Sequence, residues 1–533
     1  MSSTIGFRKA VGVCFVLLYL AVGVPLWYKL TNIYRAPLPS QYIESLHDNV
    51  FQDVHMVIPV YLKSDLYKFP DLHDAVQVQV NHLLNTREHD VAWSLQVLQY
   101  DEKLMKGLEE AGDDVYMVDL VLDESCGFVP GFGTKHVTVL YDDESVATND
   151  LPFFVAQTLV EHVFGMEWDV FSNYWNRTQN SVAVLYKPDI HISISLLNGG
   201  SQPVSWEIDE VLKEYFTPFR QFITSLVNFT VDTSIIYHND LNLHSLNNSA
   251  EVSVSDLSHH IDLSDLSAMN DFKESSSVNL AIVYPDPEVS PNGLNYIQGH
   301  ERADDVLHPW NSFIVPQWGV VAINKYPLKK HSVISKEYLK PIVYQFANDM
   351  AKLLGLVDIN DDFNTPYITV ESFKRVMILN NIEKSVETLW SLVKLSKQFQ
   401  QMSIPKEVMG NVTEALDLRL EIVDLLNNPE KGTDLDWSYA LSMSNKLVAL
   451  TECAFFHGEM VQQNFFPQEH KVAVYLPLLG PLTIVIFLGA ISLFKEVPST
   501  DKTDEDSDEK DVNIDSETEG PELTNEKAEM KHD

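Results

Sequence analysis

The chain has few cysteines and lacks the sequence patterns of the common catalytic families. Its 533 residues include only three cysteines, Cys14, Cys126 and Cys453, which excludes a disulfide-dense scaffold. It contains no Cys-x-x-Cys pair, no Gly-x-Ser-x-Gly elbow, no His-Glu-x-x-His motif and no Walker loop. These patterns mark redox or zinc chemistry, serine hydrolases, zinc peptidases and nucleotide binding, respectively. The sequence therefore indicates no catalytic residue, no metal ligand set and no cofactor.

Basic residues are also scarce. The chain has 37 Lys and Arg against 76 Asp and Glu, which gives a formal net charge of −39. This composition argues against a nucleic-acid partner, because binding to phosphates requires a basic surface. Residues 495–533 contain 15 acidic and 5 basic side chains and few apolar ones. The composition predicts an acidic, disordered tail, because so few apolar groups cannot offset the loss of chain entropy on folding.

Two uncharged apolar runs lie near the ends of the chain, Ala10 to Tyr28 and Val472 to Phe494. A helix needs about 20 apolar residues to cross a bilayer, so the sequence predicts a transmembrane helix at 10–28 and another at 472–494. A cleaved signal peptide is the alternative for the first run, but Pro25 disfavours the best cleavage point. Lys and Arg are more frequent after the second run than before it. This asymmetry places residues 1–9 and 495–533 in the cytosol and the large middle region in the lumen.

The middle region contains four Asn-x-Ser/Thr sequons. They begin at Asn176, Asn228, Asn247 and Asn411. These asparagines are candidate glycosylation sites if the region is lumenal, although four sequons is close to the number that chance would supply.

Residue patterns in the middle region predict a mixed α and β fold with a helix-rich C-terminal part. Strand-like runs rich in β-branched residues occur at 54–62, 93–100, 115–122, 136–141, 182–196, 234–237, 278–285 and 313–324. Apolar residues at three- and four-residue spacing occur at 73–85, 152–164, 206–228, 335–355, 370–397, 412–427 and 434–464. We interpret these as an α/β lobe at 29–332, with helices on a central sheet, and a helical lobe at 333–471. Residues 240–276 are rich in Ser, Asn and Asp and are predicted to form a polar surface insertion.

Three local motifs resemble ligand sites but lack essential parts. Asp358, Asn360, Asp362 and Asn364 alternate as in a calcium loop, but Phe363 occupies the position of the required glycine. His259 and His260 lie in the polar insertion, without a third histidine at ligand spacing. Gly131 and Gly133 form a lone Gly-x-Gly, for which a turn is the better interpretation than a phosphate loop. These three motifs are therefore expected to be linkers, solvated residues and a turn.

Cys126 and His457 form the one conceivable nucleophile and base pair. A thiol nucleophile requires a nearby imidazole to remove its proton, but the two residues occur in the reverse of the order found in legumain-type cysteine peptidases, and Ser125 replaces the alanine expected before the cysteine. A small buried cysteine is the ordinary alternative. A disulfide between Cys126 and Cys453 is also open, since an oxidising lumen permits it and the sequence does not decide it.

Several segments together resemble one protein family. They are Pro25 to Thr31 with Tyr34 to Pro39 (YRAPLP), Val278 to Pro285 (VNLAIVYP), Phe313 to Asn324 (FIVPQWGVVAIN) and Lys471 to Leu478 (KVAVYLPL). Their order and spacing resemble those of the PIG-S family, the class S subunit of glycosylphosphatidylinositol (GPI) transamidase. Val320 departs from the family pattern, which usually has a second glycine after the Trp-Gly pair.

The resemblance implies a non-catalytic endoplasmic-reticulum membrane subunit that supports the attachment of GPI anchors to proteins. The implied partners are the PIG-K catalytic subunit, PIG-T, PIG-U and a Gaa-type subunit. Two other hypotheses follow from the residues alone. One is a membrane-tethered lumenal enzyme with a cysteine nucleophile, and the other is a cell-surface receptor or adhesion protein.

Overall fold

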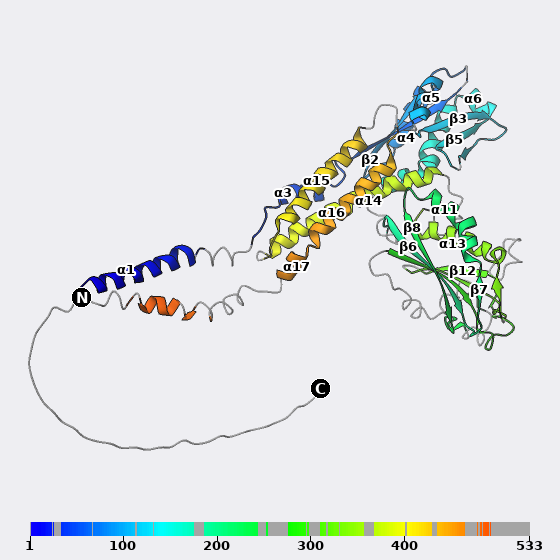
Figure 1. Ribbon diagram of the computed structural model, residues 1–533. Coiled ribbons are helices and arrows are strands. Elements are labelled where there is room, and N and C mark those ends of the chain that lie inside the picture. Colours follow the sequence, from blue (N-terminus) through cyan, green and yellow to red (C-terminus); the bar gives the residue numbers. More distant parts are fainter. Residues whose placement is uncertain are drawn as a thin grey trace, which may run out of the picture. The chain divides into compact units, whose positions relative to one another are not determined.

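The computed structural model describes most of the chain between its two ends (Figure 1). The described residues are 2–23, 25, 34–64, 66, 68–111, 114–131, 133–174, 186–243, 252–253, 276–294, 296–297, 310–315, 318–329, 331–356, 367–399, 402–428, 434–463, 477, 480–481, 483–489 and 491. Contacts divide the chain into two units, Ile33–Phe465 and a second unit that combines Met1–Asn32 with Phe466–Asp533. Each unit is described by itself.

The unit that combines the two ends contains helix α1 (Ser2–Leu18), which continues as a π-helical turn η1 (Tyr19–Gly23). Side chains such as Phe15, Leu18 and Phe487 are more than half exposed in it. The hydroxyl groups of Tyr19 and Thr483 lie 2.9 Å apart and share a hydrogen bond. The two apolar runs therefore touch each other. Within the described residues, no helix combines the length and the apolar character that a bilayer crossing requires.

The larger unit begins with a five-stranded sheet in the order β2-β1-β3-β5-β4. Its strands are β1 (His55–Lys63), β2 (Ala92–Gln99), β3 (Tyr116–Leu122), β4 (Gly127–Pro130) and β5 (His136–Tyr141). All pairs are parallel except β4 with β5. The connecting and covering helices are α4 (Leu72–Leu84), α5 (Glu102–Ala111), α6 (Asp143–Thr148), α7 (Leu151–Gln157), η2 (Thr158–Val163) and α8 (Gly165–Ser172). Strand β1 is buried along most of its length, as expected for a parallel strand that is covered on both faces.

A second five-stranded sheet has the order β12-β13-β10-β6-β8. Its strands are β6 (Asp189–Asn198), β8 (Asn228–Tyr237), β10 (Ser276–Tyr284), β12 (Trp310–Val315) and β13 (Gly319–Asn324), and only β12 runs antiparallel to its neighbour. Helices α10 (Ile208–Val211), η3 (Leu212–Phe216), α11 (Thr217–Phe222) and α13 (Lys336–Leu354) accompany this sheet. Two short pairs complete the strands, β7 (Ser205–Trp206) with β14 (Val333–Ile334) and β9 (Val252–Ser253) with β11 (Tyr296–Ile297).

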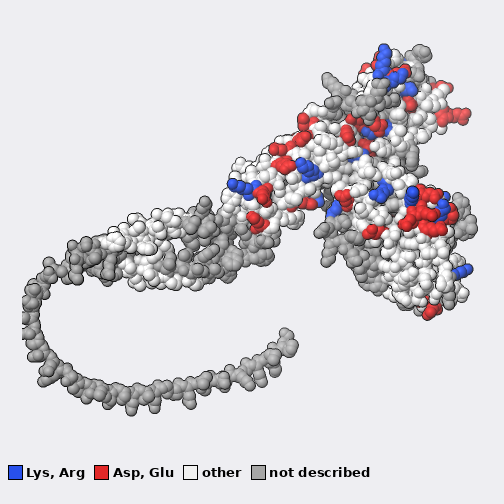
Figure 2. Space-filling model, viewed as in Figure 1, with Lys and Arg blue, Asp and Glu red and all other residues white. Residues whose placement is uncertain are grey.

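The C-terminal part of this unit is helical. Its elements are α14 (Tyr367–Gln398), α15 (Lys406–Asn427), α16 (Trp437–Phe455) and α17 (Gly458–Gln463), and α3 (Ser40–Asp48) from near the N-terminus packs against α14. On the face drawn in Figure 2, Lys and Arg side chains lie among Asp and Glu side chains along these helices. Acidic side chains gather over the region of α11 and α13.

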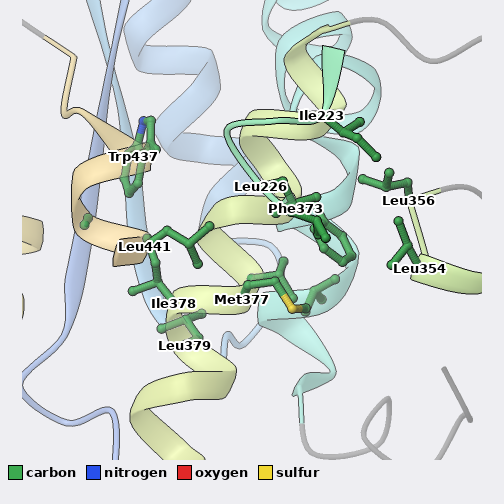
Figure 3. Close-up of a cluster of buried hydrophobic side chains, with 14 of the residues drawn as sticks. Ile223, Leu226, Leu354, Leu356, Phe373, Met377, Ile378, Leu379, Trp437 and Leu441 are labelled. Carbon is green, nitrogen blue, oxygen red and sulfur yellow. The ribbon is translucent and has the colours of Figure 1, made fainter. Parts of the chain in front are cut away.

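Helix α14 is the central element of the hydrophobic core. Figure 3 shows Ile378 and Leu379 of α14 beside Leu441 of α16, whereas Phe373 lies on the side of α14 that faces Ile223. All five residues belong to one continuous cluster that includes residues from both sheets. Residues 370–379 of α14 are buried without a break, and such a helical segment needs apolar neighbours on every side. Its neighbours come from α16 on one side and from residues such as Ile223 and Leu354 on the other.

The mixed α and β class and the helix-rich C-terminal part are confirmed. The expectation of one central sheet is wrong, because the strands divide between two separate five-stranded sheets. Sequence patterns locate strand-forming residues but do not say which strands pair, since pairing depends on contacts between distant residues. Most of the polar insertion at 240–276 lies outside the described residues.

Candidate functional site

The structure does not bring Cys126 and His457 together. Cys126 precedes β4 and is exposed, and desolvation by its neighbours together with the Asp142 carboxylate raises the pKa of its thiol. His457 follows α16, and its Nε2 lies 3.3 Å from a carboxylate oxygen of Glu407. Cys126 and Cys453 are both free thiols. The nucleophile, the base and the disulfide therefore all lack the geometry they require.

The other candidates from the sequence fall in three places. Asn228 is exposed at the start of β8, where its amide donates to Asp189 at 3.1 Å, and Asn411 lies in α15. Gly131 lies in the turn between β4 and β5, as expected. The remaining ones, namely Asn176, Asn247, His259, His260 and 358–364, lie outside the described residues. Among the described residues, no group of three His, Cys, Asp or Glu side chains is placed to hold a metal ion.

A buried ionic cluster, which sequence reasoning missed, joins the first sheet to the helices. Arg375 of α14 is fully buried, and its Nε donates to Glu167 of α8 at 2.6 Å. Its Nη1 donates to the Tyr116 hydroxyl of β3 at 3.1 Å, and its guanidinium lies over the Trp437 ring. Burial, which outweighs the effect of Arg375, raises the pKa of Tyr116 well above its usual value. The tyrosine therefore stays a neutral acceptor.

A second group of buried charges extends this cluster. Lys135, which precedes β5, donates to Asp434 at 2.7 Å, and its ammonium lies 3.7 Å from Glu371. Lys374 bonds the other oxygen of Glu371 at 2.6 Å and the Ser438 hydroxyl at 3.0 Å. Burial tends to raise the pKa of Glu371, but the attraction of Lys135 and Lys374 outweighs it. The pKa of Glu371 is therefore lower than its usual value.

The ionic cluster holds two parts of the fold together. It fastens β3, β5 and α8 of the first sheet to α14 and the start of α16 through charge-assisted hydrogen bonds, which are about twice as strong as neutral ones. Because buried charges are costly to separate, the ionic cluster resists relative movement of these elements. Its contacts serve positioning, since every ion in it is matched by another protein group.

A cleft lies at the carboxyl edge of the second sheet. A cavity of about 1070 Å³ is lined by residues from 199–202, 284–292, 326–329 and 332–338, together with His238. We call it the carboxyl-edge cleft. It lies where β6, β10 and β13 end in the same direction. The chain passes from β6 to β8 on one side, while β10 lies on the other side. Ligands of open α/β sheets bind at such a switch point.

Two glycines allow the loops at this edge to approach each other. A Cβ on Gly199 would lie 2.5 Å from the backbone nitrogen of Asp286, and one on Gly200 would lie 3.0 Å from Pro287. Asn198, 1% exposed, closes the turn by accepting from the Gly200 amide at 3.1 Å. The Gly-Gly pair after a long apolar strand was the available sequence signal for this site, and it was overlooked.

Phenol side chains form the floor of the cleft. Tyr284 is 2% exposed, and its hydroxyl has no hydrogen-bond partner. Its ring meets Trp310 edge-on at 5.4 Å, and Trp310 in turn contacts Tyr338. The Tyr338 hydroxyl accepts from Asn324 at 2.8 Å. Burial raises the pKa of both tyrosines, so both are neutral donors at physiological pH.

A smaller cavity of about 500 Å³ lies at the carboxyl ends of β1 and β2 in the first sheet. Its charged side chains already have partners: Lys63 lies 3.7 Å from Asp119, and Lys106 donates to Glu102 at 2.8 Å. Its charged side chains are therefore less available to a ligand than the polar groups of the carboxyl-edge cleft.

The chain is similar to known proteins along nearly its whole length. The family model of the phosphatidylinositol-glycan biosynthesis class S protein matches residues 14–500. The chain belongs to this class S family. It is 58% identical to the GPI transamidase component GPI17 of Saccharomyces cerevisiae, over 93% of each chain. It is 24% identical to the PIG-S homolog of Schizosaccharomyces pombe, covering 91% of this chain and 83% of that protein. Identity to the human GPI-anchor transamidase component PIGS is 22%, over 94% and 97% of the two chains.

Membership of the class S family agrees with the segments that carried the resemblance. The Tyr34 to Pro39 segment docks on the α14–α15 connection, where the Ala36 amide donates to Ile404 at 2.9 Å and Arg35 donates to the Ser396 carbonyl at 2.6 Å. The Val278 to Pro285 segment contains most of β10, a central strand. Val320, which departs from the family pattern, is fully buried in β13 opposite Leu280, so a β-branched residue fits this strand.

Proposed function

We propose that this chain is a non-catalytic subunit of GPI transamidase that positions other components over the endoplasmic-reticulum membrane. Membership of the class S family and the 58% identity to a GPI transamidase component make it a component of that complex. Geometry supports the non-catalytic role: the group beside Cys126 is the Asp142 carboxylate, whereas His457 lies beside Glu407, and the pKa of the Cys126 thiol is raised. A nucleophilic cysteine needs a lowered one.

The buried ionic cluster between the first sheet and the helices suits a positioning role. Ion pairs that are 0–6% exposed hold the first sheet and α8 on α14. The bidentate pair of Arg419 with Asp53, 2.7 Å for both bonds, fastens α15 to the segment before β1. Rigid contacts of this kind keep binding surfaces at constant separations, which a subunit that orients other proteins requires.

We also propose that the two apolar runs are embedded in the endoplasmic-reticulum membrane, with both termini cytosolic and the unit at 33–465 lumenal. Exposed apolar side chains on both runs, among them Phe15, Leu17, Val485 and Phe487, support this. On the face drawn in Figure 2, the described residues of the unit that combines the two ends include no charged groups. The shared hydrogen bond of Tyr19 and Thr483 would be protected from water in lipid, where polar contacts link helices.

The two other hypotheses have less support. A lumenal enzyme would need a base near Cys126, whereas His457 lies beside Glu407. A cell-surface receptor has no support in the family to which the chain belongs.

The proposal is tested by isolating the full chain in mild detergent and identifying its partners by mass spectrometry. We expect a cysteine-peptidase-like subunit and further transamidase components to copurify. In cells that carry only Cys126→Ser, the surface level of a GPI-anchored reporter should match that of the wild type and of Cys453→Ser. Absence of such partners contradicts the subunit role, and loss of the reporter only with Cys126→Ser contradicts the non-catalytic role.

A further inference from the structure

We propose that the carboxyl-edge cleft binds a ring-shaped polyhydroxylated headgroup, such as a sugar or an inositol. This inference rests on the proposed function and extends it, because it assigns a glycan contact to this subunit. Three observations carry it: the place of the cleft in the sheet, an unsatisfied buried phenol, and the chemistry of the lining residues.

The place of the cleft favours a ligand site. The carboxyl ends of β6, β10 and β13 lie at this edge, and residues of the loops that follow them line the cleft. The close approach of Gly199 to Asp286 leaves no room for a side chain at position 199, so the two loops meet backbone to backbone at this edge. Parallel sheets open such a crevice only where the connections diverge to opposite sides, and this sheet diverges at β6 and β10.

The Tyr284 hydroxyl is the sharpest indication of an absent partner. It is shielded from solvent and has no hydrogen-bond partner among the described residues, and Tyr284 is one of the residues that line the cleft. A buried hydroxyl without a partner is unfavourable, and native proteins rarely keep one without a reason. A hydroxyl of a bound ligand would supply both a donor and an acceptor to this phenol.

The lining chemistry selects the ligand class. The exposed rings of Tyr326 and Tyr338 can pack against the C–H face of a sugar or inositol ring. Polar groups of the lining residues, among them Ser201, Gln202 and Asn292, match its ring hydroxyls. Among the described lining residues, Asp286 and Glu288 outnumber the single cation Lys329. Excess negative charge repels a phosphate, so a free phosphate is disfavoured.

An extended peptide is also disfavoured. Peptides commonly bind sheets by adding a strand along an open edge. Here β6 and β10 are interior strands that meet the cleft with their ends. The cleft therefore offers no free backbone ladder for strand addition.

The experiment uses the full chain in nanodiscs and saturation-transfer-difference NMR with four soluble probes: α-mannotriose, myo-inositol, inorganic phosphate and the peptide Gly-Ser-Ala. We expect transfer to α-mannotriose or myo-inositol and none to phosphate or the peptide. Tyr284→Phe should weaken the affinity about fivefold to tenfold, as expected for the loss of one hydrogen bond. Its melting temperature should equal or exceed that of the wild type, because no hydrogen bond is lost from the free protein.

Tyr186→Phe provides the matched control. The Tyr186 hydroxyl donates to the Leu226 carbonyl at 3.0 Å, away from the cleft lining, so this variant should lose stability and keep the affinity. Binding of phosphate or peptide alone, no binding of any probe, or equal affinity in Tyr284→Phe would each overturn the proposal. Copurification of Tyr284→Phe with the transamidase components separates this outcome from failure of the proposed function, since subunit assembly does not require the cleft.

Discussion

At the scale of single residues, the buried charges determine which elements can pack against each other. Arg375 and Glu167 are both fully shielded from water, and one oxygen of Glu167 has no hydrogen-bond partner among the described residues. An ion pair of this kind gains little net stability, because the attraction only offsets the cost of desolvation. Its value lies in specificity, since any arrangement that separates α8 from α14 leaves a bare charge in the core.

This balance predicts the effect of breaking the pair. Arg375→Leu should lower the free energy of unfolding by about 3–5 kcal/mol, because it leaves Glu167 charged and unpaired. The urea denaturation midpoint, followed by tryptophan fluorescence, measures the loss. The double variant Glu167→Leu with Arg375→Leu should recover most of it. As a control, Lys446→Ala removes an exposed pair with Glu414 and should change stability by less than about 1 kcal/mol. A double variant no more stable than Arg375→Leu would contradict this account.

Asp349 of α13 gives a pH-dependent prediction. Burial raises its pKa to about 6, although Gln345 donates to it at 2.8 Å and Lys352 is nearby. The folded pKa is above the unfolded value, so the stability that the proton contributes is complete below about pH 4 and is lost as the pH rises through 6. Asp349→Asn should therefore be about 2–3 kcal/mol more stable than the wild type at pH 7.

The test for Asp349 is a pair of melting curves at several pH values. The advantage of Asp349→Asn should shrink steadily between pH 6 and pH 4. A constant difference across this range would show that the carboxylate does not titrate there.

At the scale of elements, a glycine determines how the second sheet closes. Gly319 begins β13 with φ +148°, and a Cβ there would lie 1.9 Å from the Asn279 carbonyl oxygen of β10. Packing therefore requires glycine at position 319, because a side chain there would keep β13 from pairing with β10. Trp318 fills the adjacent apolar cluster.

Alanine substitution tests this requirement. Gly319→Ala should destabilise the protein by at least about 3 kcal/mol, because the methyl group overlaps the backbone of β10. Gly410→Ala is the matched control, since Gly410 lies exposed in α15 with open space around its Cα. It should stabilise the protein by about 0.5–1 kcal/mol, as alanine favours helices. Thermal unfolding monitored by circular dichroism compares the two, and equal melting temperatures would contradict the account.

Long elements followed from the sequence, and short ones did not. The three- and four-residue spacing of 370–397 predicted α14 within a few residues, and the run at 278–285 predicted β10. Helices α3 and α5 and strand β4 were missed, because a few turns or four residues show too little periodicity. The run at 313–324 is two strands, β12 and β13, since the backbone turns back at Trp318.

At the scale of the whole molecule, α14 connects parts of the chain that are distant in sequence. It contacts α3, α8 and α16, and its buried face belongs to the same core as both sheets. The larger unit therefore has a main core shared by both sheets, beside two smaller apolar clusters, although the two sheets do not pair with each other.

The proposed orientation predicts that the unit at 33–465 is protected in sealed microsomes. Added protease should remove residues 501–533 and leave the middle intact until detergent is added. Endoglycosidase should lower the mass of the wild type, and Asn228→Gln should reduce that shift, because Asn228 is exposed at the start of β8. Digestion of the middle in sealed vesicles would contradict the lumenal placement.

The sequence by itself determined the mixed α and β class, the positions of the long helices and strands, and the family, because these depend on local composition, on short-range periodicity and on the order of motifs. Only the tertiary structure decided that the strands form two sheets, that Glu167 meets Arg375 from 208 positions away, and that three strand ends open onto one cleft. Strand pairing and the contact of Glu167 with Arg375 produce no local sequence pattern, since they join residues that only the folded chain brings within a few ångströms.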